Sequence, residues 1–229
     1  MAGKRFDAIE LYNNPKVPLD FVELATLQGI VASIHNPHSH GWHEFFLQND
    51  EQAEQWKQTQ QLADFFGAQQ IIVHPSRGHA LPDLFVNLEK IHDQRIIVEN
   101  MAGCDIDNQP MRAGQTLEDL EVIRKHYAIC FDLEKAVKAA VFQGLDYRNY
   151  ITKAIASLQP DYFQLSGGDK DSPIDEHQNL WKANFDIAWI KQQLVREALN
   201  RDILLVLETP KAGSTLENDC KNLEFFKSV

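Results

Sequence analysis

Seven short apolar runs recur along the chain at fairly even spacing. Each is rich in β-branched and aromatic residues, and most lack the strict alternation of apolar and polar positions that marks a strand with one solvated face. Near-continuous apolar runs are typical of parallel strands that are covered on both faces. The expected strands lie at residues 6–12, 29–35, 69–75, 95–100, 128–132, 161–166 and 203–209.

The segments between these runs have helical periodicity and are rich in good helix formers. Asn49 or Asp50 can cap the first of them and Gly67 can end it, while Thr116 with Asp119 resembles a capping box at the start of the third. Helices are expected at residues 50–67, 81–94, 116–127 and 185–200.

This alternation of strands and helices predicts a parallel sheet, which builds either a closed barrel or an open doubly wound sheet. An open sheet usually carries a glycine-rich nucleotide-binding turn after an early strand, and the chain has no GxGxxG or GxxxxGKS/T motif. The predicted fold class is therefore α/β, a TIM-type (β/α) barrel with about seven recognisable parallel strands. Without a linker rich in Pro, Gly or Ser, residues 1–229 are expected to form one domain.

Composition narrows the classes of partner and location. The formal net charge of −11 disfavours a broad basic surface for nucleic acid. No stretch approaches about 18 consecutive apolar residues, and the first residues lack the apolar core of a signal peptide. We therefore expect no membrane span and a cytoplasmic location. Three cysteines without CxxC spacing favour buried or incidental thiols over a disulfide framework.

Residues that bind metals or exchange protons stand at the ends of nearly all the apolar runs. The carboxyl ends of parallel barrel strands meet on one face, where barrel active sites lie. Three carboxylates that converge there would repel one another unless a cation or a raised pKa compensated them. Imidazoles beside them complete a ligand set suited to Zn²⁺, Mn²⁺ or Co²⁺. The metal ligands predicted in this way are His35, His74, Glu99, Asp132, Gln164 and Glu208.

The remaining histidines have two interpretations. The loop after the second run, HNPHSHGWH, is either a local metal-binding tract or a polar loop whose histidines face solvent. Asp175 and His177 form an Asp-x-His pair after the sixth run, which either approaches a metal from a loop or belongs to an ordinary turn. The loop histidines are His38, His40 and His43, and surface positions are expected for His79, His92 and His126.

Seven segments together resemble the xylose-isomerase-like TIM barrels, the superfamily that includes endonuclease IV and many sugar isomerases and epimerases. IVENMAG and LVLET are the most specific pieces, and the similarity covers most of the chain from Phe6 onward. In this alignment the family's usual first strand is missing, which accounts for a count of seven. The segments, in the family's order, are SIHNPHS, IIVHPSRGH, IIVENMAG, ICFDLEKA, FQLSGGD, IDEHQNL and LVLETP.

The resemblance to endonuclease IV implies a set of zinc ligands. It makes His35, His74 and Glu99 ligands of one zinc ion. Glu99 would then bridge to a second zinc ion, which Asp132 and Glu208 also hold.

Two of that family's ligand positions are changed in this chain. The second zinc's histidine falls on Gln164, whose amide oxygen is a weaker ligand for a borderline-soft metal. The third zinc's histidine falls on Lys135, which leaves Asp175 and His177 for that metal and places an ammonium where the metal would sit. A complete trinuclear centre for phosphodiester cleavage is therefore not expected.

The resemblance to the sugar isomerases and epimerases implies a single Mn²⁺-type ion and two glutamates that move protons beside the sugar carbonyl. Here Glu99 and Glu208 would take those catalytic roles, and Asp132 and Gln164 would complete the metal shell. The predicted function is a divalent-metal-dependent isomerase or epimerase using Zn²⁺ or Mn²⁺. The alternatives are a zinc phosphodiesterase of the AP endonuclease type and a degenerate barrel without catalysis.

The expected partner is a small sugar-like molecule rather than nucleic acid. A closed pocket with aromatic walls from Trp42, Phe45 or Trp181 would suit such a substrate. A barrel that lacks one strand exposes a sheet edge, and edges are usually covered or paired. A homodimer is therefore compatible with the sequence.

Overall fold

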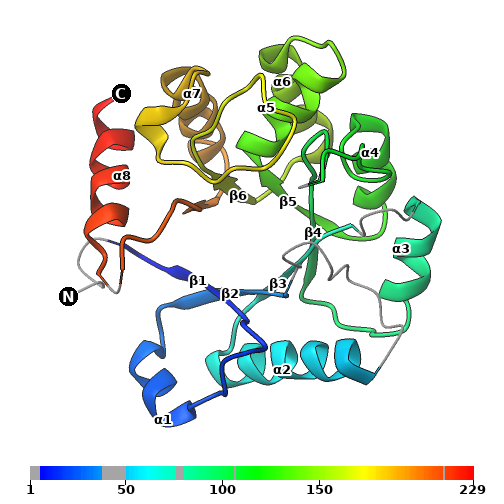
Figure 1. The fold of residues 1–229 in the computed structure, drawn as a ribbon, viewed down its shortest axis with the longest axis vertical. Coiled ribbons are helices and arrows are strands. Elements are labelled where there is room, and N and C mark those ends of the chain that lie inside the picture. Colours follow the sequence, from blue (N-terminus) through cyan, green and yellow to red (C-terminus); the bar gives the residue numbers. More distant parts are fainter. Residues whose placement is uncertain (1–5, 38–49, 76–79, 106, 214) are drawn as a thin grey trace. The chain divides into compact units, whose positions relative to one another are not determined.

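The computed structural model describes residues 6–37, 50–75, 80–105, 107–213 and 215–229 (Figure 1). Contacts within the chain define two compact units, Met1–Val98 and Glu99–Val229. In the described residues, none of the helices combines the length and apolar character that a membrane crossing requires.

The first unit contains strands β1 to β4 in parallel, in the order β1-β2-β3-β4, with Ile34 beside Ile71 and Ile71 beside Ile96. The last residue of β4, Glu99, begins the second unit. The elements are β1 (Ile9–Tyr12), α1 (Phe21–Leu24), the 3-10 helix η2 (Ala25–Leu27), β2 (Val31–His35), α2 (Asp50–Phe66), β3 (Gln70–Val73), α3 (Leu81–Leu88) and β4 (Ile96–Glu99).

Helix α2 covers the sheet of the first unit. It packs against β2 and β3, and Trp56, Leu62 and Ala63 are its buried apolar residues. The helix ends where Gly67 adopts a φ of +65°, a conformation that residues with a Cβ rarely take. The predicted end of this helix is confirmed.

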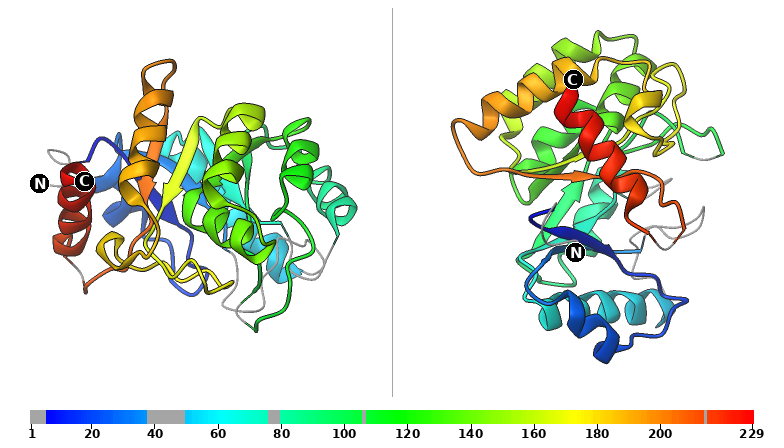
Figure 2. Two further views of the ribbon diagram at one scale, coloured as in Figure 1. Left: turned by 90° about the horizontal axis from the view of Figure 1, so that it is seen from above. Right: turned by 90° about the vertical axis from the view of Figure 1, so that its left-hand side faces the viewer.

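The second unit contains strands β5, β6 and β7, again parallel and in chain order, with Phe131 beside Phe163 and Phe163 beside Leu205. Helices α7 and α8 lie side by side on this unit (Figure 2). The elements are α4 (Leu117–Arg124), β5 (Ala128–Asp132), α5 (Leu133–Phe142), α6 (Tyr147–Leu158), β6 (Tyr162–Leu165), the 3-10 helix η3 (Leu180–Lys182), α7 (Ile187–Ala198), β7 (Leu204–Leu207) and α8 (Glu217–Ser228).

Side-chain caps fix where the helices of the second unit begin. Asp132, Asp146 and Asp186 each accept a backbone N–H from the first turn of α5, α6 and α7. Thr116 caps α4 in the same way by accepting from the Asp119 N–H. The Asp119 carboxylate accepts from the backbone N–H of Gly114 at 3.1 Å and so binds the loop that precedes α4.

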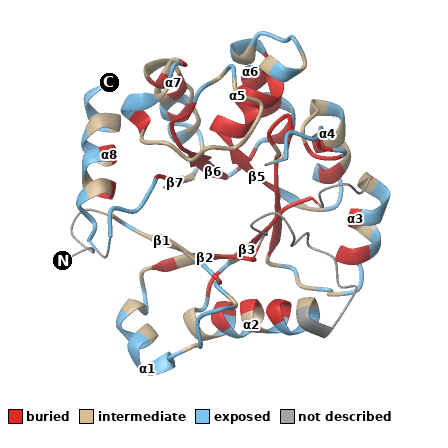
Figure 3. Ribbon diagram, in the orientation of Figure 1, coloured by how far each residue is buried: buried red, intermediate tan, exposed pale blue. Residues whose placement is uncertain are grey.

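Helix α5 is buried along most of its length. It packs against β5, β6 and α6, and every residue from Leu133 to Ala140 is buried (Figure 3). This stretch includes the charged side chains of Glu134, Lys135 and Lys138. Charged residues are almost never fully buried unless they are paired, so partners are required inside the unit.

In both units strand order follows chain order, as it does in TIM barrels, whereas doubly wound sheets reverse direction at a switch point. The α/β, TIM-type prediction with seven parallel strands is confirmed in the described residues. The helix expected at residues 81–94 ends earlier, at Leu88, where a 3-10-like turn follows. The assignment of residues 1–229 to one domain stays a prediction.

Candidate metal centre

Three carboxylates meet where strands of the second unit end. Glu99 is the last residue of β4, Asp132 is the last residue of β5, and Glu208 directly follows β7. One oxygen from each lies within 4.8 Å of the other two. Parallel strands bring these side chains together because their carboxyl ends share one edge.

Asn100 locks the first two of these strand ends together. Its amide nitrogen donates to the backbone oxygen of Asp132 at 2.9 Å, and its amide oxygen accepts from the Asp132 N–H at 2.6 Å. These two hydrogen bonds resemble the backbone pairing between neighbouring strands, and they lie just beyond the end of β4. They fix the position of Asp132 relative to Glu99, the residue before Asn100.

The cluster suits a divalent cation. Glu99 and Asp132 are fully buried, and burial raises the pKa of Asp132 to about 6 although Lys135 opposes that shift. Asp132 Oδ2 is buried and has no hydrogen-bond donor in the described residues. Converging carboxylate oxygens, one of them without a hydrogen-bond donor, are ligands that Zn²⁺, Mn²⁺ or Mg²⁺ accept. The residues present therefore fit a bound metal ion.

Lys135 already supplies one positive charge to this cluster. Its buried ammonium contacts Glu99 Oε1, and it lies 3.3 Å from Asp175 Oδ2 and 3.9 Å from Asp132 Oδ2. Burial alone would lower the pKa of Lys135, but Asp175 and Glu99 outweigh it and raise that pKa well above its usual value. Lys135 therefore stays charged.

His177 lies between two hydrogen-bond acceptors. Its Nε2 is 2.7 Å from Asp175 Oδ2, and its Nδ1 is 3.2 Å from the backbone oxygen of Glu208. Neither oxygen can donate, so both ring nitrogens carry a proton. Burial opposes this charge, but Asp175 and Glu208 raise the pKa of His177 to about 11. An imidazolium has no lone pair for a metal, so the predicted ligand role of His177 requires a different pairing.

Asp175 is held by two cations at once. Burial favours its neutral form, but Lys135 and His177 outweigh that effect and hold its pKa well below its usual range. The predicted ligand role of Asp175 stays a prediction, and here its Oδ2 faces protein cations.

Gln164 stands beside Asp132 in the sheet, in register with it on the neighbouring strand β6. Its side chain is fully buried, and its amide oxygen lies 3.0 Å from the Cys130 thiol, which donates to it. The oxygen predicted as a metal ligand thus points at a thiol here. Cys130, Cys104 and Cys220 are all free, as expected for a chain without a disulfide framework.

In the first unit, His35 and His74 form a close imidazole pair. Both are buried, and their ring centroids are 5.1 Å apart in an edge-to-face arrangement. The Nδ1 of His35 is 2.9 Å from the backbone oxygen of Asn36, so Nδ1 donates, and in the neutral imidazole Nε2 carries the lone pair. This is the tautomer in which Nε2 can bind a metal.

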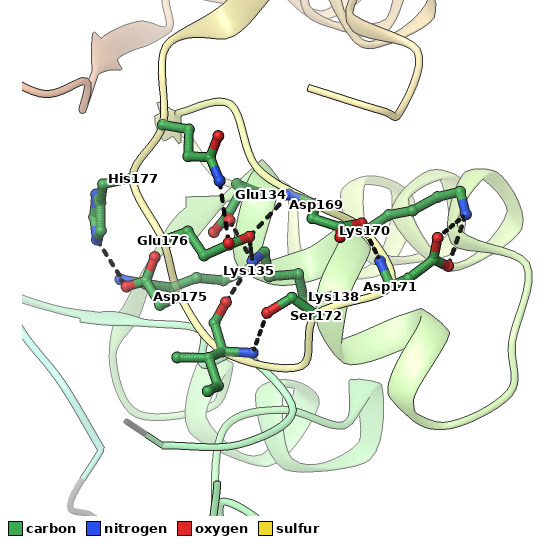
Figure 4. Close-up of polar contacts among 12 residues, drawn as sticks. Glu134, Lys135, Lys138, Asp169, Lys170, Asp171, Ser172, Asp175, Glu176 and His177 are labelled. Atoms are coloured by element: carbon green, nitrogen blue, oxygen red, sulfur yellow. Dashed lines mark hydrogen bonds and ion pairs between the residues drawn. The ribbon is translucent and has the colours of Figure 1, made fainter. Parts of the chain in front are cut away.

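In each unit, some neighbours of the candidate residues were not predicted from the sequence. Lys138 bridges Glu134 at 3.0 Å and Glu176 at 2.6 Å, and it also donates to the backbone oxygen of Ile174 (Figure 4). The i, i+4 spacing of Glu134 and Lys138 in an otherwise apolar helix was the available signal. Tyr12, whose ring centroid lies 5.7 Å from that of His35, carried no such signal.

The other candidate residues have mixed outcomes. His92 and His126 are exposed, which confirms their expected surface positions. Trp181 is 40% exposed and contacts Phe225 of α8 with ring centroids 6.3 Å apart. Residues outside the described part of the chain include His38, His40, Trp42, His43, Phe45 and His79.

No protein-family model matches the chain, and no curated protein matches its sequence. Solved structures do match. A D-tagatose 3-epimerase-like protein is 17% identical with a TM-score of 0.69, covering 99% of this chain and 89% of that one. Endonuclease IV from Thermus thermophilus is 19% identical with a TM-score of 0.70, covering 97% and 88%.

AP endonuclease, family 2, from Brucella melitensis is 13% identical with a TM-score of 0.62, covering 99% of this chain and 90% of that one. Identities this low establish the fold and leave the reaction open. Near-full coverage means that the likeness is not confined to one segment. The chain therefore has the fold of the xylose-isomerase-like TIM barrels.

Proposed function

We propose that this protein is a divalent-metal-dependent isomerase or epimerase that acts on a small sugar-like substrate. The observation that carries the proposal is the convergence of Glu99, Asp132 and Glu208 within 4.8 Å, with Asp132 Oδ2 buried and without a hydrogen-bond donor among the residues that the structure describes. Sites of this kind bind cations and perturb the pKa of a carboxylate, which are features of proton-transfer chemistry.

A bound Zn²⁺ or Mn²⁺ would polarise the carbonyl and hydroxyl oxygens of the substrate. In the proposed reaction Glu99 and Glu208 move the proton. One glutamate accepts it from the carbon beside the carbonyl, and it returns to the opposite face of that carbon or to the neighbouring carbon. The first outcome is epimerisation. The second is isomerisation, in which the hydroxyl proton also passes to the former carbonyl oxygen. In both, the substrate keeps its atoms.

Asp132 would bind the metal through Oδ2, since its Oδ1 already accepts from the Lys135 N–H at 2.9 Å and caps α5. Gln164 would join the shell once its amide turns from Cys130. Glu99 and Glu208 would also be metal ligands. The same two side chains would therefore bind the metal and transfer the proton.

A second candidate is a zinc phosphodiesterase of the AP endonuclease type. The observation in its favour is the pair of buried histidines, His35 and His74, with Nε2 of His35 able to bind a metal. The Lys135 ammonium inside the carboxylate cluster and the net charge of −11 favour the sugar-like substrate instead. The degenerate barrel remains the alternative without catalysis.

Exchange of the substrate's carbon-bound proton with solvent tests the proposal, and the product need not be known for this test. The protein, loaded with Mn²⁺ or Zn²⁺, is incubated in D₂O with a panel of ketoses and aldoses, and NMR follows deuterium entering beside the carbonyl. We expect metal-dependent exchange with at least one sugar, and its loss in Glu99→Gln. The matched control is Glu118→Gln, an exposed glutamate of α4, which should exchange at the wild-type rate.

Two outcomes would contradict the proposal. Cleavage of an oligonucleotide with an abasic site, without exchange on any sugar, would support the phosphodiesterase. Neither exchange nor cleavage, together with no bound metal by elemental analysis, would support the degenerate barrel. Retained exchange in Glu99→Gln would remove Glu99 from the catalytic role.

A further inference from the structure

Lys135 places its ammonium where carboxylates would otherwise face one another. The side chain is 1% exposed, and its contacts are with Glu99, Asp132 and Asp175. Figure 4 shows Lys135 beside Asp175. These three residues come from a strand end, a helix cap and a loop that are distant in sequence. The ammonium is therefore the common partner of three separate elements.

The helix does not favour this position by itself. Lys135 is in the first turn of α5, where the partial positive charge of the helix N-terminus opposes a cation. The burial of a charged amine also costs free energy. The surrounding carboxylates offset both the charge of the helix N-terminus and the cost of burial. The negative charge of the cluster therefore stabilises Lys135 in this position.

A second lysine holds the loop that presents Asp175. Lys138, one helical turn further along α5, bonds Glu176 at 2.6 Å, and Glu176 also accepts from the Asp169 N–H at 2.8 Å. Gly168 lies so close to α5 that an added Cβ would overlap Glu134 Oε1. The loop is thus fixed against the helix, and Asp175 stays within reach of Lys135.

We infer that Lys135 takes the place of a second divalent cation, so that this carboxylate cluster binds a single metal ion. A carboxylate has two oxygens, so Glu99 can hold the ammonium with one and offer the other to a metal. Asp132 Oδ2 and Glu208 complete the metal's side of the cluster. Asp175 belongs to the ammonium's side. The inference rests on the proposed function only in assuming that the cluster takes a metal ion.

The test is the number of Mn²⁺ ions bound per chain, measured by equilibrium dialysis and elemental analysis. We expect one ion in the wild-type protein and two in Lys135→Met, because the substitution removes the ammonium that Glu99, Asp132 and Asp175 share. Lys170→Met is the control. Among the described residues Lys170 forms its ion pair with the exposed Asp171, so its replacement should leave the count unchanged. The double variant Lys135→Met with Asp175→Asn should lose the added ion.

Lys135→Gln is the second variant, because it removes the charge and keeps a hydrogen-bond donor for Glu99. Its melting temperature should rise more with added Mn²⁺ than that of the wild-type protein, since a ligand of the folded state stabilises it. An unchanged count in both variants, or two ions in the wild-type protein, would overturn the inference. A wild-type count of zero would also overturn it. One ion in the wild-type protein and two in Lys135→Met, without proton exchange on any sugar, would refute the proposed isomerase and leave the inference standing.

Discussion

The Asn100 side chain bonds both backbone groups of Asp132: its amide nitrogen donates to the oxygen at 2.9 Å, and its amide oxygen accepts from the N–H at 2.6 Å. Both residues are buried, so neither backbone group has water as a substitute. This pair sets the position of Asp132 relative to Glu99, which precedes Asn100 in the chain.

Replacement of Asn100 by Ala should destabilise the protein by about 2 kcal/mol, because two buried backbone groups lose their partners. Urea unfolding followed by circular dichroism measures this change. Asn200→Ala is the control, since the Asn200 amide donates only to the Arg196 oxygen at the exposed end of α7. Equal stability of the two variants would show that water replaces the Asn100 contacts.

Asp132→Asn should separate capping from metal binding. Asn is as good an N-cap as Asp, so α5 should still begin at Leu133. Burial raises the pKa of Asp132 to about 6, and the substitution removes that buried carboxyl, so the metal-free protein should be no less stable. Mn²⁺ affinity should fall at least about tenfold, measured by calorimetric titration.

Asp146→Asn is the matched control for that experiment, because Asp146 caps α6 at an exposed position outside the cluster. It should leave Mn²⁺ affinity unchanged. A similar affinity in Asp132→Asn and the wild-type protein would exclude Asp132 as a ligand.

Lys138→Met should be strongly destabilising, by about 3 to 5 kcal/mol, because it leaves Glu134 and Glu176 near each other without their cation. The double variant Lys138→Met with Glu134→Gln should regain part of that loss, since one buried charge is removed. Chemical denaturation of the two variants compares them. A double variant less stable than Lys138→Met would contradict this account of the ion pairs.

Asp93 should make stability depend on pH in the acid range. Hydrogen bonds from the Arg95 side chain lower its pKa to about 2, against about 4 in an unfolded chain. The folded state therefore holds the Asp93 proton less tightly than the unfolded state. The resulting stabilisation is complete above pH of about 4 and is lost as pH falls toward about 2.

Melting temperatures between pH 6 and 2.5 test this dependence. Asp93→Asn should melt below the wild-type protein at pH 6, and the gap should close as the pH falls. Asp64→Asn is the control, because Asp64 bonds Arg95 at 2.7 Å from a side chain that is 71% exposed. A gap for Asp93→Asn that stays constant with pH would refute the assignment.

The strands were predictable because their apolar runs are continuous and bounded by polar ends. All seven expected runs contain the observed strands, and Thr116 caps its helix as its residue type indicated. The tandem helices α5 and α6 were not among the expected helical segments. Only Asp132 separates the apolar run of β5 from the first residue of α5, so no loop composition marks a boundary between the strand and the helix.

The convergence of Glu99, Asp132 and Glu208 follows from strand ends alone, which sequence reasoning could locate. The surroundings of His177 could not be found in this way. Its Nδ1 partner is the backbone oxygen of Glu208, 31 residues away, and no residue type encodes a backbone acceptor. Lys138 was missed for a related reason, since lysine in a helix is expected at the surface.

The Cys130 thiol can report when the sheet of the second unit opens, because its reaction with a thiol reagent requires that opening. Its thiol is fully buried and bonded to Gln164, one layer beneath Asp132, whereas Cys220 is partly accessible. A thiol reagent should therefore modify Cys220 at once and reach Cys130 only when strands β5 and β6 separate. Cys104 is buried as well, so it is first replaced by Ser. The slow phase of labelling then measures the opening rate of the sheet that carries the carboxylates.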